Sequence, residues 1–119
     1  MKVAVIGSRC ADESSYLPLC EAVPLGASEI LSGGAPGADA LAKRYAAEGG
    51  LLFREFLPNY ERYGKNAPLV RNAEIVQHAD YVIAIWDGVS KGTGSVIMEC
   101  LKTYTPVKVI GCSPSSKPL

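Results

Sequence analysis

The sequence predicts an α/β fold: a Rossmann-like three-layer sandwich around a parallel five-stranded sheet, with probable strand order 3-2-1-4-5. Three observations predict it. Short apolar runs alternate with segments of helical periodicity. The apolar runs are continuous, as in strands buried on both faces. Glycine-rich turns follow the first, second and fourth runs, and ligands in such sheets bind beyond the carboxyl ends of the strands, where the strand order reverses.

The first half of the chain is typical of two successive strand–helix units. Residues 3–6 form an apolar strand, residues 13–23 a first helix, and residues 29–31 a second short strand. A second helix begins at Pro36, a residue that suits the first helical turn, and ends at Gly49-Gly50. Its apolar residues recur at helical spacing and predict one buried face: Ala38, Leu41, Ala42, Tyr45 and Ala46.

The second half continues the alternation and closes one domain. Its expected elements are a strand at 51–56, an irregular stretch at 57–67, a helix at 68–78, a strand at 81–86, a helix carrying Val96, Ile97, Cys100, Leu101 and Tyr104, and a strand at 107–110. We therefore expect residues 1–111 to form a single Rossmann-like ligand-binding domain. Residues 112–119 are rich in Ser and Pro and predict a loosely held tail.

Composition excludes several classes of function. Lys and Arg number 12, as do Asp and Glu, so the net charge is zero, which argues against non-specific nucleic-acid binding. No apolar run approaches the length of a membrane span, and the opening strand turns too soon for a signal peptide. The scattered cysteines and the single histidine argue against a metal site. We expect reduced cysteines and a cytoplasmic protein.

The glycine-rich turns predict an anion site. Phosphate binding uses backbone N–H groups at a helix start, with no side chain in the way. Two of the turns fit this requirement, one with Gly33, Gly34 and Gly37 before the second helix, the other with Gly92, Thr93 and Gly94 before the fourth. A single such turn is more simply explained as a tight turn. Three glycine-rich turns at one sheet edge favour a ligand.

Charged residues near these turns have two interpretations each. Arg9 either binds a phosphate through paired hydrogen bonds or is a solvated surface arginine. Arg71-Asn72 can bind a ligand only if its helix points its first turn at the pocket. Asp39 either holds a ribose hydroxyl or complements the helix dipole. Asp87 ends the fourth strand and is the stronger candidate for a ligand contact. The full set of expected ligand-binding residues is Gly7, Ser8, Arg9, Ser32, Gly33, Gly34, Gly37, Asp39, Arg71, Asn72, Asp87, Gly92, Thr93 and Gly94.

These segments resemble a known family. "GSR" at 7–9, "SGGAPGAD" at 32–39, "RN" at 71–72, "ADYVIAIWDG" at 79–88 and "SKGT" at 90–93 are similar to the motifs of the SMF/Lonely-Guy (SLOG) superfamily, closest to its small single-domain branch. The resemblance covers the chain up to about Ile110 and implies a nucleotide-like ligand and a homo-oligomer, with a dimer favoured. Pro68 departs from the pattern, which has glycine there.

Two better-known relatives imply rival functions. Lonely-Guy enzymes cleave the N-glycosidic bond of nucleoside monophosphates with a glutamate three residues beyond the motif threonine, but here that residue is Val96. Glu99 and Asp87 are the carboxylates that could substitute. DNA-processing A proteins share the motifs at 7–9 and 32–39 and bind single-stranded DNA, for which a positive groove with stacking aromatics is typical. Only tyrosines such as Tyr60 and Tyr63 suggest that here.

We therefore expect a domain that binds a nucleotide or nucleotide-derived phosphate ligand, as a sensor or carrier. The phosphate is expected on the glycine-rich turns with Arg9 as its counter-charge, and Asp87 and Asp39 on the sugar or amino groups. The alternatives are a nucleoside monophosphate N-ribohydrolase, a single-stranded nucleic-acid-binding module, and a fold that serves assembly with a vestigial pocket. No catalytic residue, cofactor or metal is assigned.

Overall fold

A parallel sheet of five strands forms the centre of the computed structural model, which describes residues 1–113 of the 119. The strand order is β3-β2-β1-β4-β5, which confirms the predicted fold class and order. The strands are β1 (Lys2–Gly7), β2 (Glu29–Ser32), β3 (Leu52–Glu55), β4 (Tyr81–Trp86) and β5 (Val107–Gly111). The helices are α1 (Tyr16–Ala22), α2 (Pro36–Gly49), α3 (Tyr60–Tyr63), α4 (Ala67–His78) and α5 (Lys91–Lys102), with 3-10 turns η1 (Glu13–Ser15) and η2 (Gly64–Asn66).

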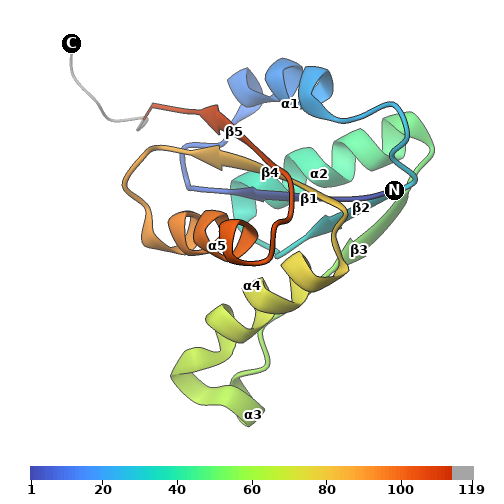
Figure 1. The fold of residues 1–119 in the computed structure, drawn as a ribbon. Helices are drawn as coiled ribbons and strands as arrows, with labels where there is room; N and C mark the ends of the chain where they lie inside the picture. The colour runs from blue at the N-terminus through green and yellow to red at the C-terminus, as the bar shows by residue number, and fades with distance from the viewer. Residues whose placement is uncertain (114–119) are drawn as a thin grey trace.

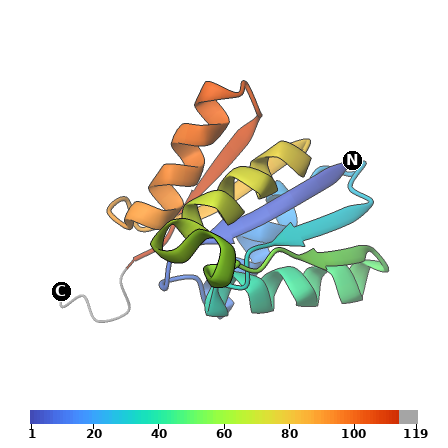
Figure 2. The same ribbon diagram turned by 90° about the horizontal axis from the view of Figure 1, so that it is seen from below.

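The helices cover both faces of the sheet. α1 and α2 lie on one face, and α4 and α5 lie side by side on the other (Figures 1 and 2). β1 shows why the apolar runs are continuous. Val3 and Val5 belong to the core beneath α1 and α2, whereas Ala4 and Ile6 belong to the core beneath α4 and α5. Each fully buried valine or isoleucine stabilises the fold by about 1.5–3 kcal/mol.

The strand order reverses beside β1. β1 pairs with β2 through Val5 and Ser32, and with β4 through Gly7 and Ile85. All of these pairs are parallel, so the carboxyl ends of β1, β2 and β4 meet at one edge of the sheet. The turns that follow these three strands are the glycine-rich turns of the sequence.

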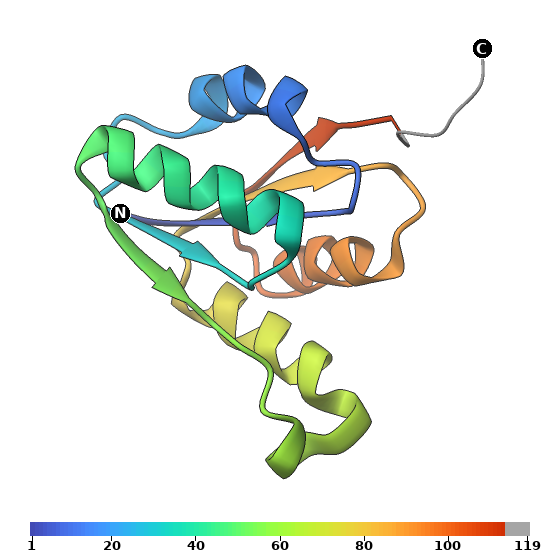
Figure 3. The ribbon, with the colours of Figure 1, turned by 180° about the vertical axis from the view of Figure 1, so that it is seen from behind.

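The stretch at 57–67, expected to be irregular, holds two short helical turns. α3 and η2 project from the body beyond α4 (Figure 3). The side chain of Asn59 caps α3 by accepting a hydrogen bond from the Arg62 N–H at 3.2 Å. Gly64 ends it with a φ of +56°, a conformation that glycine adopts without steric cost. Local capping thus orders a segment whose polar composition carries no helical periodicity.

The expectation that the cysteines are reduced is wrong for two of them. Cys10 and Cys112 form a disulfide although 102 residues separate them, while Cys20 and Cys100 are free. Spacing along the chain did not indicate this pair because the sheet brings the two positions together. Cys112 is the first residue of the expected loose tail, and it is held here by the disulfide; residues 114–119 of that tail lie outside the described residues. Within residues 1–113, no helix is both long and apolar enough to cross a membrane.

Candidate functional site

A pocket of about 360 Å³ opens at the carboxyl edge of the sheet, over the ends of β1 and β2 and beside the turn that follows β4. The loop after β1, the loop before α2, the start of α5 and one side of α4 surround it. The structure therefore brings together segments that lie far apart in the sequence. The expected ligand-binding residues that line it are Gly7, Ser8, Arg9, Ser32, Gly33, Arg71, Asn72, Asp87, Gly92 and Thr93.

Two helix starts border the pocket. α2 begins after Ala35 and α5 after Ser90, and both of these N-cap residues line the pocket. Neither N-cap side chain accepts a hydrogen bond from the first turn of its helix. The first N–H groups of a helix have no partner within the helix, and they carry its partial positive charge. The two helix starts thus provide backbone donors for an anion.

Arg71 supplies a positive charge inside the pocket. Its guanidinium donates to the Gly33 carbonyl oxygen, and its Nε donates to Asn72 Oδ1 at 2.7 Å. The side chain is half-buried, and burial lowers the pKa of the guanidinium. No carboxylate among residues 1–113 forms an ion pair with it. α4 therefore brings this arginine to the pocket from its second turn, whereas the functional interpretation expected its first turn to point there.

Arg9 has a different environment. It lines the pocket from the loop after β1, but its side chain is exposed to solvent. An exposed guanidinium attracts an anion through water, which screens the interaction. Arg71 is therefore the better-placed counter-charge, and Arg9 lies at the rim.

Three buried hydroxyl side chains line the pocket. Ser8 Oγ donates to Thr93 Oγ1 at 3.2 Å, which joins the loop after β1 to the first turn of α5. Ser32 is 1% exposed, and its Oγ has no hydrogen-bond partner among the described residues. An unpaired buried hydroxyl costs about 1–3 kcal/mol. Ser32 therefore keeps an unused hydrogen-bonding group in the pocket wall.

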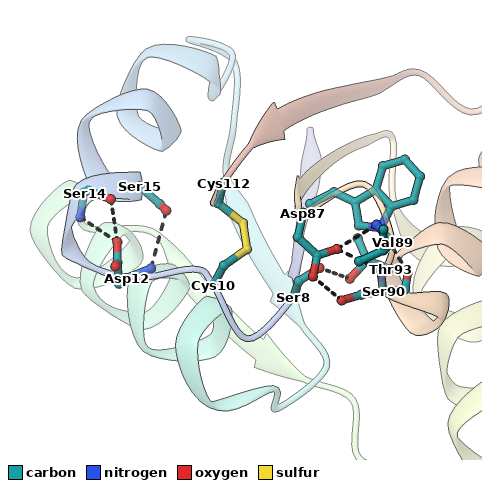
Figure 4. The surroundings of a disulfide bond; sticks show 11 residues. Ser8, Cys10, Asp12, Ser14, Ser15, Asp87, Val89, Ser90, Thr93 and Cys112 are labelled. Carbon is teal, nitrogen blue, oxygen red and sulfur yellow. Dashed lines mark hydrogen bonds between the residues drawn. A yellow bond between two sulfur atoms is a disulfide. The ribbon is translucent and has the colours of Figure 1, made fainter. Parts of the chain in front are cut away.

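Asp87 shapes the turn between β4 and α5. Its Oδ1 accepts hydrogen bonds from the N–H groups of Val89 and Ser90 at 2.9 and 2.7 Å, and its Oδ2 accepts from Ser90 Oγ at 2.6 Å (Figure 4). Hydrogen bonds from Ser90, first from its side chain and then from its backbone, lower the pKa of Asp87. The carboxylate lines the pocket, but it is largely engaged by its own turn.

The other four expected ligand-binding residues do not line the pocket: Gly34, Gly37, Asp39 and Gly94. Asp39 is buried and turned towards β3, where it pairs with Lys43 Nζ at 3.4 Å and where its proximity to Glu55 raises the pKa of that carboxyl. Gly37 lies against the Ala11 carbonyl, and Gly94 lies against the ring of Trp86. Gly37 and Gly94 are glycines because neighbouring atoms leave little space for a Cβ. Asp39 misses the pocket because it lies on the face of α2 that is turned towards β3.

Several lining residues were not expected. They are four apolar residues, Val5, Ile6, Ala35 and Ala38, together with Ser90 at the start of α5. The sequence could not show that these four residues line a pocket, because apolar residues at strand ends and helix starts look the same as residues of the core. Ser90 had a usable signal, because serine directly before a helix is a frequent N-cap.

Comparison with protein-family models, with curated proteins and with solved structures found no match for this chain. The fold itself, a Rossmann-like parallel sheet of order 3-2-1-4-5, stands on the structure alone.

Proposed function

We propose that the chain binds a nucleotide or a nucleotide-derived phosphate ligand in this pocket, as a sensor or carrier. The observation that carries the proposal is Arg71, a half-buried cation without an ion-pair partner among residues 1–113, beside two helix starts whose N-caps leave the first turns open. Guanidinium and helix N-termini are the groups that proteins use for phosphate. A phosphate there would pair with charge that the fold leaves uncompensated.

The rest of the pocket fits a small ligand of this class. Its volume of about 360 Å³ lies near the lower end of the range of ~300–1,000 Å³ for small-molecule sites, which favours a mononucleotide over a dinucleotide. Asn72 offers hydrogen bonds to a sugar or base, Ile6 and Ala35 offer apolar surface, and the Ser32 hydroxyl, unpaired among the described residues, lies buried in the pocket wall.

We also propose that the chain is a member of the SLOG superfamily. The support is the set of motifs at 7–9, 32–39, 71–72, 79–88 and 90–93, of which each contributes residues to the pocket. Agreement of the sheet order with a Rossmann-like fold is necessary for this membership but is shared by many families.

Binding without hydrolysis is favoured over an N-ribohydrolase. Val96, at the position of the Lonely-Guy glutamate, is fully buried in the core. Among the described residues, Asp87 is the only carboxylate lining the pocket, and its lowered pKa makes it a weak general base and a poor general acid. Glu99 lies instead in a groove between α4 and α5 with Leu69 and Met98.

Thermal-shift measurements with AMP, ADP, ADP-ribose and inorganic pyrophosphate test the proposal. A ligand of this set at about 100 times its Kd should raise Tm by about 5–10 °C. Arg71→Met, which keeps the volume but removes the charge, should weaken binding by about 10- to 100-fold. Arg62→Met, which removes an exposed arginine that does not line the pocket, is the matched control.

Two results would overturn it. One is the absence of a shift with every probe, and the other is a shift that Arg71→Met leaves intact. Incubation with nucleoside monophosphates should release no free base, and release would instead support the hydrolase. Retention of single-stranded DNA that is lost at high salt would support the nucleic-acid module.

The assembly and location of the protein remain predictions. We propose a homodimer, which light scattering on the eluted protein would check. We also propose a cytoplasmic location, in which the Cys10–Cys112 disulfide is exposed to reduction.

A further inference from the structure

The Cys10–Cys112 disulfide connects the pocket loop to the end of the sheet. The Ser8 N–H donates to the Ile85 carbonyl oxygen at 2.9 Å, and the Cys112 N–H donates to the Trp86 carbonyl oxygen at 3.0 Å. Consecutive residues of β4 thus hold both cysteine-bearing segments, and the two Cα atoms are 5.8 Å apart (Figure 4). Disulfides normally span about 4.4–6.8 Å between Cα atoms. Hydrogen bonds to β4 therefore bring the two cysteine-bearing segments close enough for a disulfide.

The loop that carries Cys10 forms part of the pocket wall. Cys10 lies in a tight turn that the Ala11 N–H closes on the Ser8 carbonyl oxygen at 3.1 Å. Ser8 and Arg9 line the pocket, and the Ala11 carbonyl packs against Gly37 in the first turn of α2. A link at Cys10 therefore holds the middle of a loop that contacts both the pocket and the start of α2.

The disulfide is accessible from the side away from the pocket. A cavity of about 580 Å³ borders both cysteines, together with Asp12, Ser14 and Pro18. Cys112 is partly exposed. Cys100, by contrast, is fully buried, and burial raises the pKa of its thiol to about 11. Because thiol–disulfide exchange needs access to a sulfur, this pair is open to a small dithiol, whereas Cys100 is closed to it.

We propose that Cys10–Cys112 is a reversible redox link that holds the pocket loop in its binding conformation. One thiolate of a dithiol reductant attacks Cys112 Sγ, the S–S bond breaks, and the electron pair leaves with Cys10 Sγ, which takes up a proton. The second thiolate of the reductant then attacks the mixed disulfide and releases the Cys112 thiolate, which takes up the second proton. The protein gains two electrons and two protons, and the dithiol becomes a cyclic disulfide.

The first test needs no ligand. Thiol counting under denaturing conditions should find two thiols in the oxidised chain and four after dithiothreitol, with peptide mapping joining Cys10 to Cys112. Reduction should lower Tm by about 10 °C. It should also speed hydrogen exchange at the Ala11 amide about tenfold or more in the first seconds, when only local opening contributes. Oxidised glutathione should restore both values.

Two variants separate the link from other thiol effects. Cys112→Ser should show the Tm and the Ala11 exchange rate of the reduced chain, and dithiothreitol should change neither. Cys20→Ser keeps the link and should respond as the unchanged chain does. Four thiols after treatment with oxidised glutathione, or an Ala11 exchange rate that is the same in both states, would overturn the proposal.

The second test measures AMP affinity and rests on the proposed function. Reduction should weaken AMP binding about fivefold or more. If AMP, ADP, ADP-ribose and pyrophosphate all fail to bind either state while the Ala11 exchange responds to reduction, the proposed function fails and the redox link stands. If AMP binds both states equally and the exchange does not change, the redox link fails and the proposed function stands.

Discussion

The turns that lead into α2 and α5 both bring a helix start to the pocket, but different interactions fix their shapes. Both follow a buried strand, and both present a helix start to the pocket. At the start of α2, neighbours crowd the glycines: Gly33, before the helix, lies against the Arg71 guanidinium, and Gly37, in its first turn, lies against the Ala11 carbonyl. At the start of α5, Gly88 before the helix and Gly92 in its first turn face open space, although Gly94 lies against Trp86, and hydrogen bonds to Asp87 hold the shape of the turn. Similar glycine content therefore hides one turn fixed by packing and another fixed by polar side chains.

The largest expected effect is at Gly37. A Cβ there would collide with the Ala11 carbonyl oxygen, a backbone atom that moves only with its loop. Gly37→Ala should cost about 3 kcal/mol in the free energy of unfolding, measured with urea. Gly92→Ala is the matched control, because the added methyl meets no neighbour and alanine favours a helix, so stability should hold or rise by up to about 1 kcal/mol. Equal losses at the two positions would remove the contrast between the turns.

Backbone conformation gives the next effect, and both turns should share it. Gly34 has a φ of +82° and Gly88 a φ of +85°. Alanine at either position should cost about 1–2 kcal/mol because its Cβ strains a left-handed conformation. Gly34→Ala should cost more than Gly88→Ala, since its Cβ also meets Leu57 at 3.0 Å, while Gly88 has open space. Urea unfolding of both variants measures the difference, and the reverse order would contradict the packing argument.

The polar turn should depend on pH. Hydrogen bonds lower the pKa of Asp87 in the folded protein below its unfolded value, so its contribution is complete above the unfolded pKa of about 3.9 and is lost as the pH falls through the folded pKa. Asp87→Asn should lower Tm by a few degrees at pH 7, and the difference from the unchanged chain should shrink below about pH 4. Thermal unfolding from pH 7 to pH 2.5 checks this. A difference that is constant across this range would assign the loss to something other than the charge.

The smallest effect on stability is expected at Ser32, which ends β2 just before the packed turn. Removal of a buried hydroxyl that has no partner among residues 1–113 should leave the free energy of unfolding unchanged or raise it by up to about 1 kcal/mol. Ser32→Ala should nevertheless weaken AMP binding by about five- to tenfold, because a ligand loses its hydrogen bond there. Urea unfolding and titration calorimetry measure the two quantities. A clear loss of stability would mean that the hydroxyl already has a partner, such as a bound water.

The sequence was sufficient for the sheet order and for the meeting of the three turns, because buried parallel strands leave continuous apolar runs and their carboxyl ends share an edge. It was not sufficient for side-chain direction. Asp39 and Arg71 each occupy a helix that borders the pocket, yet one turns to Lys43 and the other to Gly33. That choice depends on helix rotation, which packing sets. The pairing of Cys10 with Cys112 likewise depends on two hydrogen bonds to β4 that no local pattern encodes.

The Ser8–Thr93 hydrogen bond spans 85 residues of sequence and joins the two halves of the doubly wound sheet beneath the pocket. A molecule bound above this bond would rest on both halves at once. Neither half could then unfold without first expelling that molecule, so a filled pocket would make the unfolding of the two halves a single cooperative event.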